Sequence, residues 1–291
     1  MNVRRLAPVV CVAVLALLAG CASRTTRVAA PAPLPPALTA TRQQLLARYE
    51  DQADAVNSLN AAVRLKAETG TAFSGVIKDY QQITALLVAE RPAWIRMVGQ
   101  APVVGTDIFD MVSDGKTFHM YIPSKKRFLV GPASGGEAAK NTIENLRPGP
   151  LLDALLWEKI PLEAPALIEE ESQAQPPSRD YVLTVLRRNG EPLEIDRRIW
   201  FNRSDLRVSR IEIFGHGGRL DSDIHYGDWR EQTGGRPFPW QIVLRQPHDD
   251  YKLEIDITRI TLNPPIPLDR FTLEQPSGTE RVEVGRSGGR P

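Results

Sequence analysis

Residues 82–131 read QITALLVAERPAWIRMVGQAPVVGTDIFDMVSDGKTFHMYIPSKKRFLVG, and this stretch decides the fold. Apolar and polar residues alternate along it, and a period of two places successive side chains on opposite faces of a strand. Asp114-Gly115 separates two of these runs, and an Asp-Gly pair between alternating residues is the strongest short-range signal for a tight hairpin. The stretch therefore predicts an antiparallel meander with one large apolar face.

The rest of the body repeats this pattern between turn residues and adds two helical segments. Residues 38–59 carry apolar side chains at helical spacing, and Thr39 or Thr41 can cap the start of that helix. Residues 148–159 predict a second helix with a wide apolar face and proline in its first turn. We predict an α+β, mostly β fold: one large curved antiparallel sheet that forms an incomplete, half-open β-barrel of about 11 strands, covered by a few helices.

The composition excludes several classes of protein. Hydrophobic residues make up 42% and charged residues 24% of the chain, as in an ordinary globular protein. Lysine and arginine total 36 against 35 for aspartate and glutamate, so there is no basic excess to attract nucleic acid. The two cysteines, Cys11 and Cys21, both precede the body. The body therefore has no disulfide, no thiol nucleophile and no cysteine metal site.

The N-terminus has the pattern of an export signal. Two arginines precede an apolar run over residues 7–19, which is too short to span a bilayer comfortably. The run ends in Leu18-Ala19-Gly20-Cys21, which resembles the lipobox of bacterial lipoproteins. The resemblance implies a lipoprotein signal peptide over residues 1–20 and acylation of Cys21. The alternatives are an ordinary secretory signal with a chance cysteine and an uncleaved anchor.

The residues after the cysteine indicate where the chain resides. Ala22 follows Cys21, and in lipoproteins a residue other than aspartate here implies the outer membrane, or the cell membrane if the host has no outer membrane. Residues 21–37 form the acylated cysteine and a Pro/Ala-rich tether. We expect one half-barrel domain over residues 38–277, with a polar loop or insertion at residues 163–179. Residues 278–291 are polar and glycine-rich and predict a disordered tail.

No constellation of residues predicts catalysis. Asp221, Asp223 and His225 share one strand face whether or not a metal is present, so we favour a solvated face over a metal site. No glycine-rich stretch has the spacing of a P-loop. We therefore predict a protein that is not an enzyme, with no catalytic residues, no metal and no cofactor.

Several short motifs occur in the order found in one known family. They are Arg91-Pro92, Trp94-Ile95-Arg96-Met97, Phe109 to Gly115, Phe118 to Pro123, Phe238 to Ile242 and Pro267 to Phe271. This order resembles the LolA/LolB superfamily of lipoprotein-localisation factors and covers most of residues 38–276. The resemblance implies an incomplete β-barrel closed on one side by helices, with a cavity between sheet and helices that takes acyl chains. An unclosed barrel with an apolar concave face has room for a ligand.

The apolar faces of the meander and of the second helix are placed to line that cavity if Arg96 and Asp110 point outward. Methionine and aromatic side chains adapt to ligands of variable shape. The alternative is that the same residues pack on the helices and fill the core. The candidate cavity residues are Ile95, Met97, Phe109, Met111, Phe118, Met120, Leu152, Leu155 and Leu156.

The expected function follows from the anchor and the resemblance together. We expect a membrane-anchored periplasmic lipoprotein that binds acyl chains of a lipid or lipoprotein, in lipoprotein localisation or lipid transport at the outer membrane. Its expected partners are the membrane, through the lipid anchor, the acyl chains, and an envelope protein, but not nucleic acid. The alternative is a non-catalytic envelope sensor or scaffold that uses the same fold to bind a protein. An envelope hydrolase would need a convergent triad, which the residue pattern does not show.

Overall fold

The computed structural model describes residues 34–70, 78–79, 81–134, 146–161, 163–174, 177–188, 193–232 and 236–284. All of these residues lie in one compact unit, residues 34–291. The predicted signal peptide, Cys21 and most of the predicted tether therefore lie outside the described residues.

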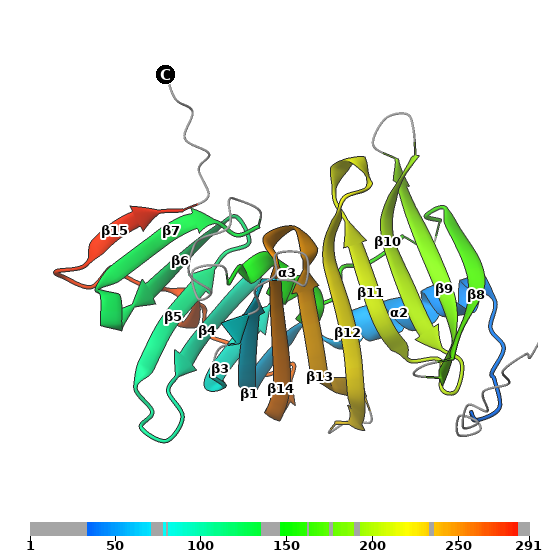
Figure 1. Ribbon diagram of the computed structural model, residues 1–291, viewed down its shortest axis with the longest axis horizontal. Helices are drawn as coiled ribbons and strands as arrows, with labels where there is room; N and C mark the ends of the chain where they lie inside the picture. Colours follow the sequence, from blue (N-terminus) through cyan, green and yellow to red (C-terminus); the bar gives the residue numbers. More distant parts are fainter. Residues whose placement is uncertain are drawn as a thin grey trace, which may run out of the picture. The chain divides into compact units, whose positions relative to one another are not determined.

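Fifteen strands of the described chain form one sheet (Figure 1). Its order is β15-β7-β6-β5-β4-β3-β1-β14-β13-β12-β11-β10-β9-β8, and β2 pairs with β1 beside this path. Neighbouring strands are antiparallel, except that β15 runs parallel to β7. The strands are β1 (Ser58–Thr69), β2 (Lys78–Asp79), β3 (Ile83–Glu90), β4 (Trp94–Gln100), β5 (Asp107–Ser113), β6 (Thr117–Ile122), β7 (Arg127–Pro132), β8 (Ala166–Ala174), β9 (Pro177–Arg188), β10 (Leu193–Asn202), β11 (Val208–Phe214), β12 (Leu220–Glu231), β13 (Pro237–Gln246), β14 (Tyr251–Leu262) and β15 (Glu280–Glu283).

The predicted fold class is confirmed: the unit is mostly β, with one large, open, curved sheet and the α-helices α2 (Arg42–Ala55) and α3 (Pro148–Leu155). The sheet has more strands than the predicted eleven. Residues 163–179, predicted as a loop, contain β8 and the start of β9, and β15 lies within the predicted tail. Both β8 and β15 are edge strands, and a polar edge strand has no alternation by which to find it.

The predicted hairpin joins β5 to β6. The Oδ1 atom of Asp114 accepts hydrogen bonds at 2.8 Å from the backbone N–H groups of Lys116 and Thr117. These bonds, above all the one from Thr117, hold the pKa of Asp114 below its usual value. Gly115 has a φ of 87°, in the left-handed region that favours glycine. A Cβ atom there would lie 2.3 Å from the Cβ of Ala93, so the turn needs glycine for a second reason.

Replacing Gly115 with alanine is expected to lower the free energy of unfolding by about 1–3 kcal/mol, because backbone strain and the clash with Ala93 add. Gly105→Ala is the matched control. Gly105 also has a positive φ, 66°, but a Cβ there meets nothing within 4 Å. Urea unfolding of both variants measures the difference. Equal losses would show that the approach to Ala93 has no effect on stability.

The inner apolar face is built in rows across paired strands. Met97 pairs with Leu87 on one side and Met111 on the other, and the row continues to Met120 and Leu129. All five side chains are at most 1% exposed. The other half of the sheet holds a similar row of paired residues, Ile199, Ile211, Ile224, Leu244 and Leu253. One continuous core therefore follows the inner face from β7 to β10.

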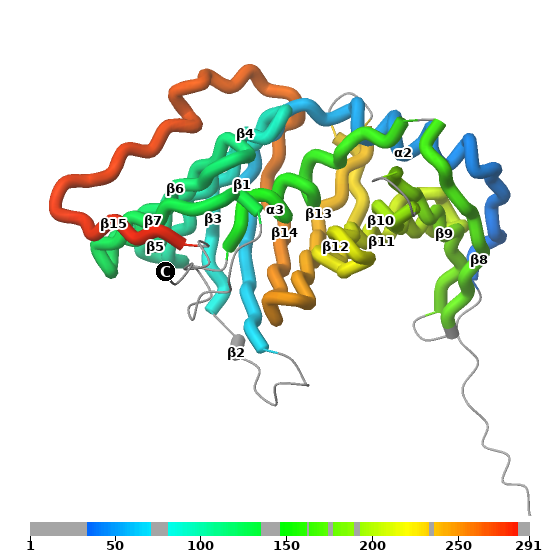
Figure 2. The backbone as a smooth tube through the Cα atoms, turned by 90° about the horizontal axis from the view of Figure 1, so that it is seen from above, coloured from blue at the N-terminus to red at the C-terminus, as the bar shows by residue number. Residues whose placement is uncertain are grey.

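The two helices lie on the same side of the sheet (Figures 1 and 2). Thr41 caps α2, as one of the two predicted residues: its hydroxyl accepts from the N–H of Gln44, whose side chain accepts from the N–H of Thr41. The helix is shorter than residues 38–59 because Val56 is already extended and β1 begins at Ser58. Helix α3 ends at Leu155, before the predicted residue 159.

Residues 263–279 connect β14 to β15 as an extended segment along the outer side of the sheet (Figure 2). Arg96 Nη1 donates to the carbonyl of Arg270 at 3.1 Å, which fastens the segment to β4. The same guanidinium binds both carboxylate oxygens of Asp110, at 3.1 and 2.7 Å. Arg96 and Asp110 thus point away from the inner face, as the alternation of the meander predicts.

Candidate functional site

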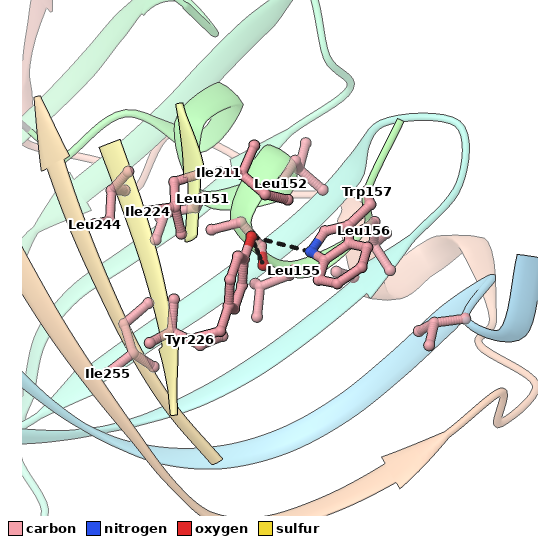
Figure 3. Close-up of a cluster of buried hydrophobic side chains, with 14 of the residues drawn as sticks. Leu151, Leu152, Leu155, Leu156, Trp157, Ile211, Ile224, Tyr226, Leu244 and Ile255 are labelled. Carbon is pink, nitrogen blue, oxygen red and sulfur yellow. Dashed lines mark hydrogen bonds between the residues drawn. The ribbon is translucent and has the colours of Figure 1, made fainter. Parts of the chain in front are cut away.

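The nine predicted cavity residues all lie in the packed core. Ile95, Met97, Met111 and Met120 are fully buried, and the most exposed of the nine, Leu152, is 7% exposed. Figure 3 shows α3 beside buried side chains of β11 to β14, and Leu151, Leu152, Leu155 and Leu156 belong to the same buried cluster as Ile211, Ile224, Leu244 and Ile255. The inner face is therefore filled by side chains where α3 covers it, and a ligand site has to lie beside that contact.

The segment after α3 is held in place by Trp157. Its indole N–H donates to the hydroxyl of Tyr226 at 3.0 Å, and that hydroxyl donates to the carbonyl of Ala154 at 3.2 Å (Figure 3). The indole also stacks on Tyr49 of α2, with ring centroids 5.2 Å apart. Burial raises the pKa of Tyr226 well above its usual value, so the phenol stays a proton donor.

Arg91, from the Arg91-Pro92 motif, joins both helices to the sheet. Its guanidinium donates to the carbonyls of Ala53 and Val56 at the end of α2, at 3.0 and 3.2 Å. It also donates to the carbonyl of Trp157 at 2.6 Å. The last carbonyls of a helix have no partner within the helix, so a cation at this position both pairs them and favours the helix dipole.

Arg197 is a buried cation on the inner face of β10. Its guanidinium donates to Glu158 Oε2 at 2.7 Å, to Asp196 Oδ2 at 2.6 Å and to the hydroxyl of Tyr49 at 3.2 Å. The Tyr49 hydroxyl donates in turn to the carbonyl of Glu158 at 2.9 Å. Burial raises the pKa of Tyr49 to about 12, against the opposing charge of Arg197. This network fixes the segment after α3 between α2 and β10.

An open pocket of about 370 Å³ lies beside the packed core. It is formed by β1, β3, β5 and β14, by the β4–β5 connection and by Leu146 before α3, and none of its described lining residues is charged. Of the nine predicted cavity residues, Phe109 lines this pocket. The Phe109 ring lies over Gly99, and a Cβ atom at Gly99 would come within 2.3 Å of that ring. The lining residues are Leu65, Ala67, Gln81, Gln82, Ile83, Ala101, Pro102, Ile108, Phe109, Leu146, Tyr251 and Leu253. We call this the apolar pocket.

A buried cation stands next to the apolar pocket. Arg147 follows the lining residue Leu146, is 5% exposed, and places its guanidinium 5.4 Å from the centre of the Phe118 ring. Burial raises the pKa of the lining residue Tyr251, and the charge of Arg147 opposes that rise. Arg147 therefore lies close behind the wall that Tyr251 forms.

The loop between β4 and β5 exposes two valines beside the same pocket. Ala101 and Pro102 line the pocket, and the next two residues, Val103 and Val104, are among the most exposed large apolar side chains described. Val103 has a φ of 75°, a conformation that β-branched residues rarely adopt. Hydrogen bonds from Gly105 N to Ala101 O, at 3.0 Å, and from Ala101 N to Thr106 O, at 2.9 Å, close the loop.

The strand face of Asp221, Asp223 and His225 is occupied by ion pairs. Arg210 Nε donates to Asp223 at 2.6 Å, and His225 Nε2 lies 3.2 Å from the same carboxylate. Burial opposes ionisation of Asp223, but the hydrogen bonds from His225 and Arg210 lower its pKa to about 2. Asp221 pairs with Arg219 instead. Within the described ranges, no group of three or more His, Cys, Asp or Glu side chains is placed to hold a metal ion.

None of the helices in the described part of the chain has both the length and the apolar character needed to cross a membrane.

Comparison with known proteins places the fold. No family model matches the chain, and no curated protein matches it. A solved DUF1329 family protein from Desulfovibrio piger is 14% identical, with a TM-score of 0.52 over 79% of this chain and 95% of that one. The chain therefore shares its fold with that protein.

Two further solved structures are similar at lower scores. One is the LolA superfamily protein NE2245 from Nitrosomonas europaea, 14% identical, with a TM-score of 0.49 over 81% of this chain and 99% of that chain. The other is a candidate outer membrane lipoprotein-sorting protein domain from Vibrio parahaemolyticus, 9% identical, with a TM-score of 0.48 over 78% and 94% of the two chains.

Proposed function

We propose that this chain is a membrane-anchored lipoprotein that binds an acyl chain of a lipid or lipoprotein in the apolar pocket, in lipoprotein localisation or lipid transport at the outer membrane. The observation that carries the proposal is an open pocket of about 370 Å³ whose described lining holds no charged residue. Burial of each methylene from water contributes about 0.8 kcal/mol, so a chain of several methylenes binds such a pocket without any specific polar contact.

In this proposal Phe109 is the one of the nine predicted residues that contacts the ligand, and the other eight belong to the buried core. The protein is a binding protein rather than an enzyme. Titration of a fluorescent fatty acid tests the proposal directly: saturable binding is expected, and a linear, non-saturable signal would contradict it.

Replacing Cys21 with serine is expected to release the chain from the membrane fraction, because serine offers no thiol for acylation. Two or more acyl chains are needed for stable anchoring, and the tether alone supplies no apolar surface of comparable size. Fractionation of cells expressing each form measures the change. A Cys21→Ser chain that stays in the membrane fraction after its signal peptide has been removed would contradict acylation of Cys21.

The exposed valines are expected to deliver the acyl chain to a membrane or to a donor. Replacing Val103 and Val104 with aspartate should slow transfer of a fluorescent fatty acid to vesicles by about tenfold or more, since two apolar side chains no longer enter the bilayer. The affinity of the chain for the fatty acid should not change. Leu268→Asp is the control, because Leu268 is 70% exposed and lies in the segment on the outer side of the sheet. Equal slowing by the control would contradict a role of the loop.

A further inference from the structure

A second pocket, of about 400 Å³, lies between α2 and the β10–β13 part of the sheet. It is formed by α2, by Trp157 after α3, by the β10–β11 connection and by the facing ends of β12 and β13. It shares no lining residue with the apolar pocket, so the two can be altered independently. Its volume lies in the range of small-molecule sites. We call this the mixed pocket, because both aromatic and charged side chains line it.

The aromatic wall of the mixed pocket consists of Trp157 and Trp229. The two rings meet edge to face, with centroids 6.2 Å apart and planes at 77°. The indole N–H of Trp157 donates to the hydroxyl of Tyr226, and one face of the indole stacks on the ring of Tyr49. Trp157 is only 5% exposed, so most of the ring surface that is open to a ligand belongs to the half-buried Trp229. Such a wall fits the apolar face of a flat or ring-shaped ligand body.

Two arginines at the rim of the mixed pocket, Arg48 and Arg236, have no ion-pair partner among the described residues. Arg207 is bound to Glu231 at 3.0 Å and lies over the ring of Trp229. Arg48 and Arg236, in contrast, form no side-chain hydrogen bond or ion pair within the described part of the chain. Guanidinium groups bind phosphate through two parallel N–H donors, which makes a phosphate the anion that best fits a pair of free arginines.

Asp51 indicates which groups the ligand presents besides its phosphate. Its side chain also lines the mixed pocket and forms no hydrogen bond or ion pair with described residues. An ionised carboxylate only accepts hydrogen bonds and repels a bare anion. Asp51 is exposed, and a ligand that contacts it as well as the two arginines is therefore expected to present hydroxyl donors next to its phosphate.

We propose that the mixed pocket binds a sugar phosphate. Arg48 and Arg236 bind its phosphate, and Asp51 accepts hydrogen bonds from its hydroxyls. The apolar face of the sugar ring packs on Trp157 and Trp229. The ligand is either a free sugar phosphate or the headgroup of a glycosylated phospholipid, since both carry the same chemistry. The proposal does not rest on acyl-chain binding, because it uses none of the residues of the apolar pocket.

Isothermal titration of the full-length chain in a non-ionic detergent with glucose-1-phosphate tests the site, with a Kd at or below about 1 mM expected. The double variant Arg48→Ala/Arg236→Ala should weaken binding by about tenfold or more. The control Arg259→Ala/Arg281→Ala removes the same charge from exposed arginines outside the pocket and should change the Kd by less than about twofold. No binding by the unaltered chain, or equal weakening by the control, overturns the proposal.

Asp51→Ala separates the sugar from the phosphate. It should weaken binding of glucose-1-phosphate, because a hydroxyl acceptor is lost, and tighten binding of inorganic phosphate, because a like charge is removed. Equal changes for both ligands would overturn the assignment of the sugar. Fatty-acid titration of the same variants should give unchanged affinity, so failure of this site and failure of the apolar pocket are distinguishable.

Vesicles identify the source of the ligand. If the ligand is a lipid headgroup, vesicles that contain phosphatidylinositol should retain more of the chain than vesicles of pure phosphatidylcholine. The difference should disappear in the Arg48→Ala/Arg236→Ala variant. Retention equal on both vesicles, with tight binding of the free sugar phosphate, assigns a soluble ligand instead. Either result supports the shared chemistry.

Discussion

Arg197→Ala is expected to lower the free energy of unfolding by about 2–3 kcal/mol, because it removes a buried side chain and a partner of the buried Tyr49 hydroxyl, whereas Glu158, 74% exposed, is left solvated. The guanidinium is 7% exposed and holds Asp196, Glu158 and the hydroxyl of Tyr49 at once. Its loss leaves the buried phenol with one partner fewer and opens a cavity beneath the segment after α3. Urea unfolding, followed by far-ultraviolet circular dichroism, measures the change.

Arg187→Ala is the matched control for that measurement. Arg187 also pairs with Asp196, at 3.1 Å, and with Glu194, at 3.6 Å, but its side chain is 30% exposed. Solvent screens such a pair, and we expect a loss of about 1 kcal/mol or less. If both variants lost the same stability, the buried network around Tyr49 would not be what holds the segment after α3.

Ala67→Phe is expected to weaken fatty-acid binding by about thirtyfold. Ala67 lies on β1, lines the apolar pocket and is only partly buried, so a larger side chain can extend into the open volume. A benzyl group there displaces two or three methylenes of a bound chain, which removes about 2 kcal/mol of the binding free energy. Titration of a fluorescent fatty acid measures the affinity.

The control is Ala47→Phe, which adds the same benzyl group on an exposed position of α2. Its affinity for the fatty acid should match that of the unaltered chain. Unchanged affinity in Ala67→Phe, in a variant whose circular dichroism shows a native fold, would place acyl-chain binding outside the apolar pocket.

The alternation of residues 82–131 was sufficient to predict the meander, its hairpin at Gly115 and the outward direction of Arg96 and Asp110. A period of two records which face of a strand is buried, and these strands lie inside the sheet with one face on the core. The edge strands β8 and β15 could not be predicted from alternation. Three successive glutamates in β8 lie where neither face is covered by a core, and no pattern then separates a strand from a loop.

The position of the pocket could not be predicted for a different reason. Periodicity predicts that Met97, Met111 and Met120 face inward, and they do, but it does not reveal what covers them. Helix α3 fills that space, and the open volume lies farther along β1 and β14, where smaller residues such as Ala67 leave room. Phe109 lies at the boundary and belongs to both sets.

The sequence does indicate that Arg197 is buried. Arg197 and Ile199 share one face of β10, so a charged residue stands at an apolar-face position. A charge at such a position needs buried partners, and Tyr49 and Glu158 supply them from α2 and from the segment after α3. Those partners are distant in the chain, so the pattern indicates the buried charge but not the residues that pair with it.

Native mass spectrometry of the body lacking residues 1–37 tests the central proposal most directly. We expect the purified body to carry a bound lipid or fatty acid, which organic extraction then identifies, and we expect the Ala67→Phe variant to carry less of it. A folded body that carries no lipid and binds no apolar dye would contradict acyl-chain binding in the apolar pocket.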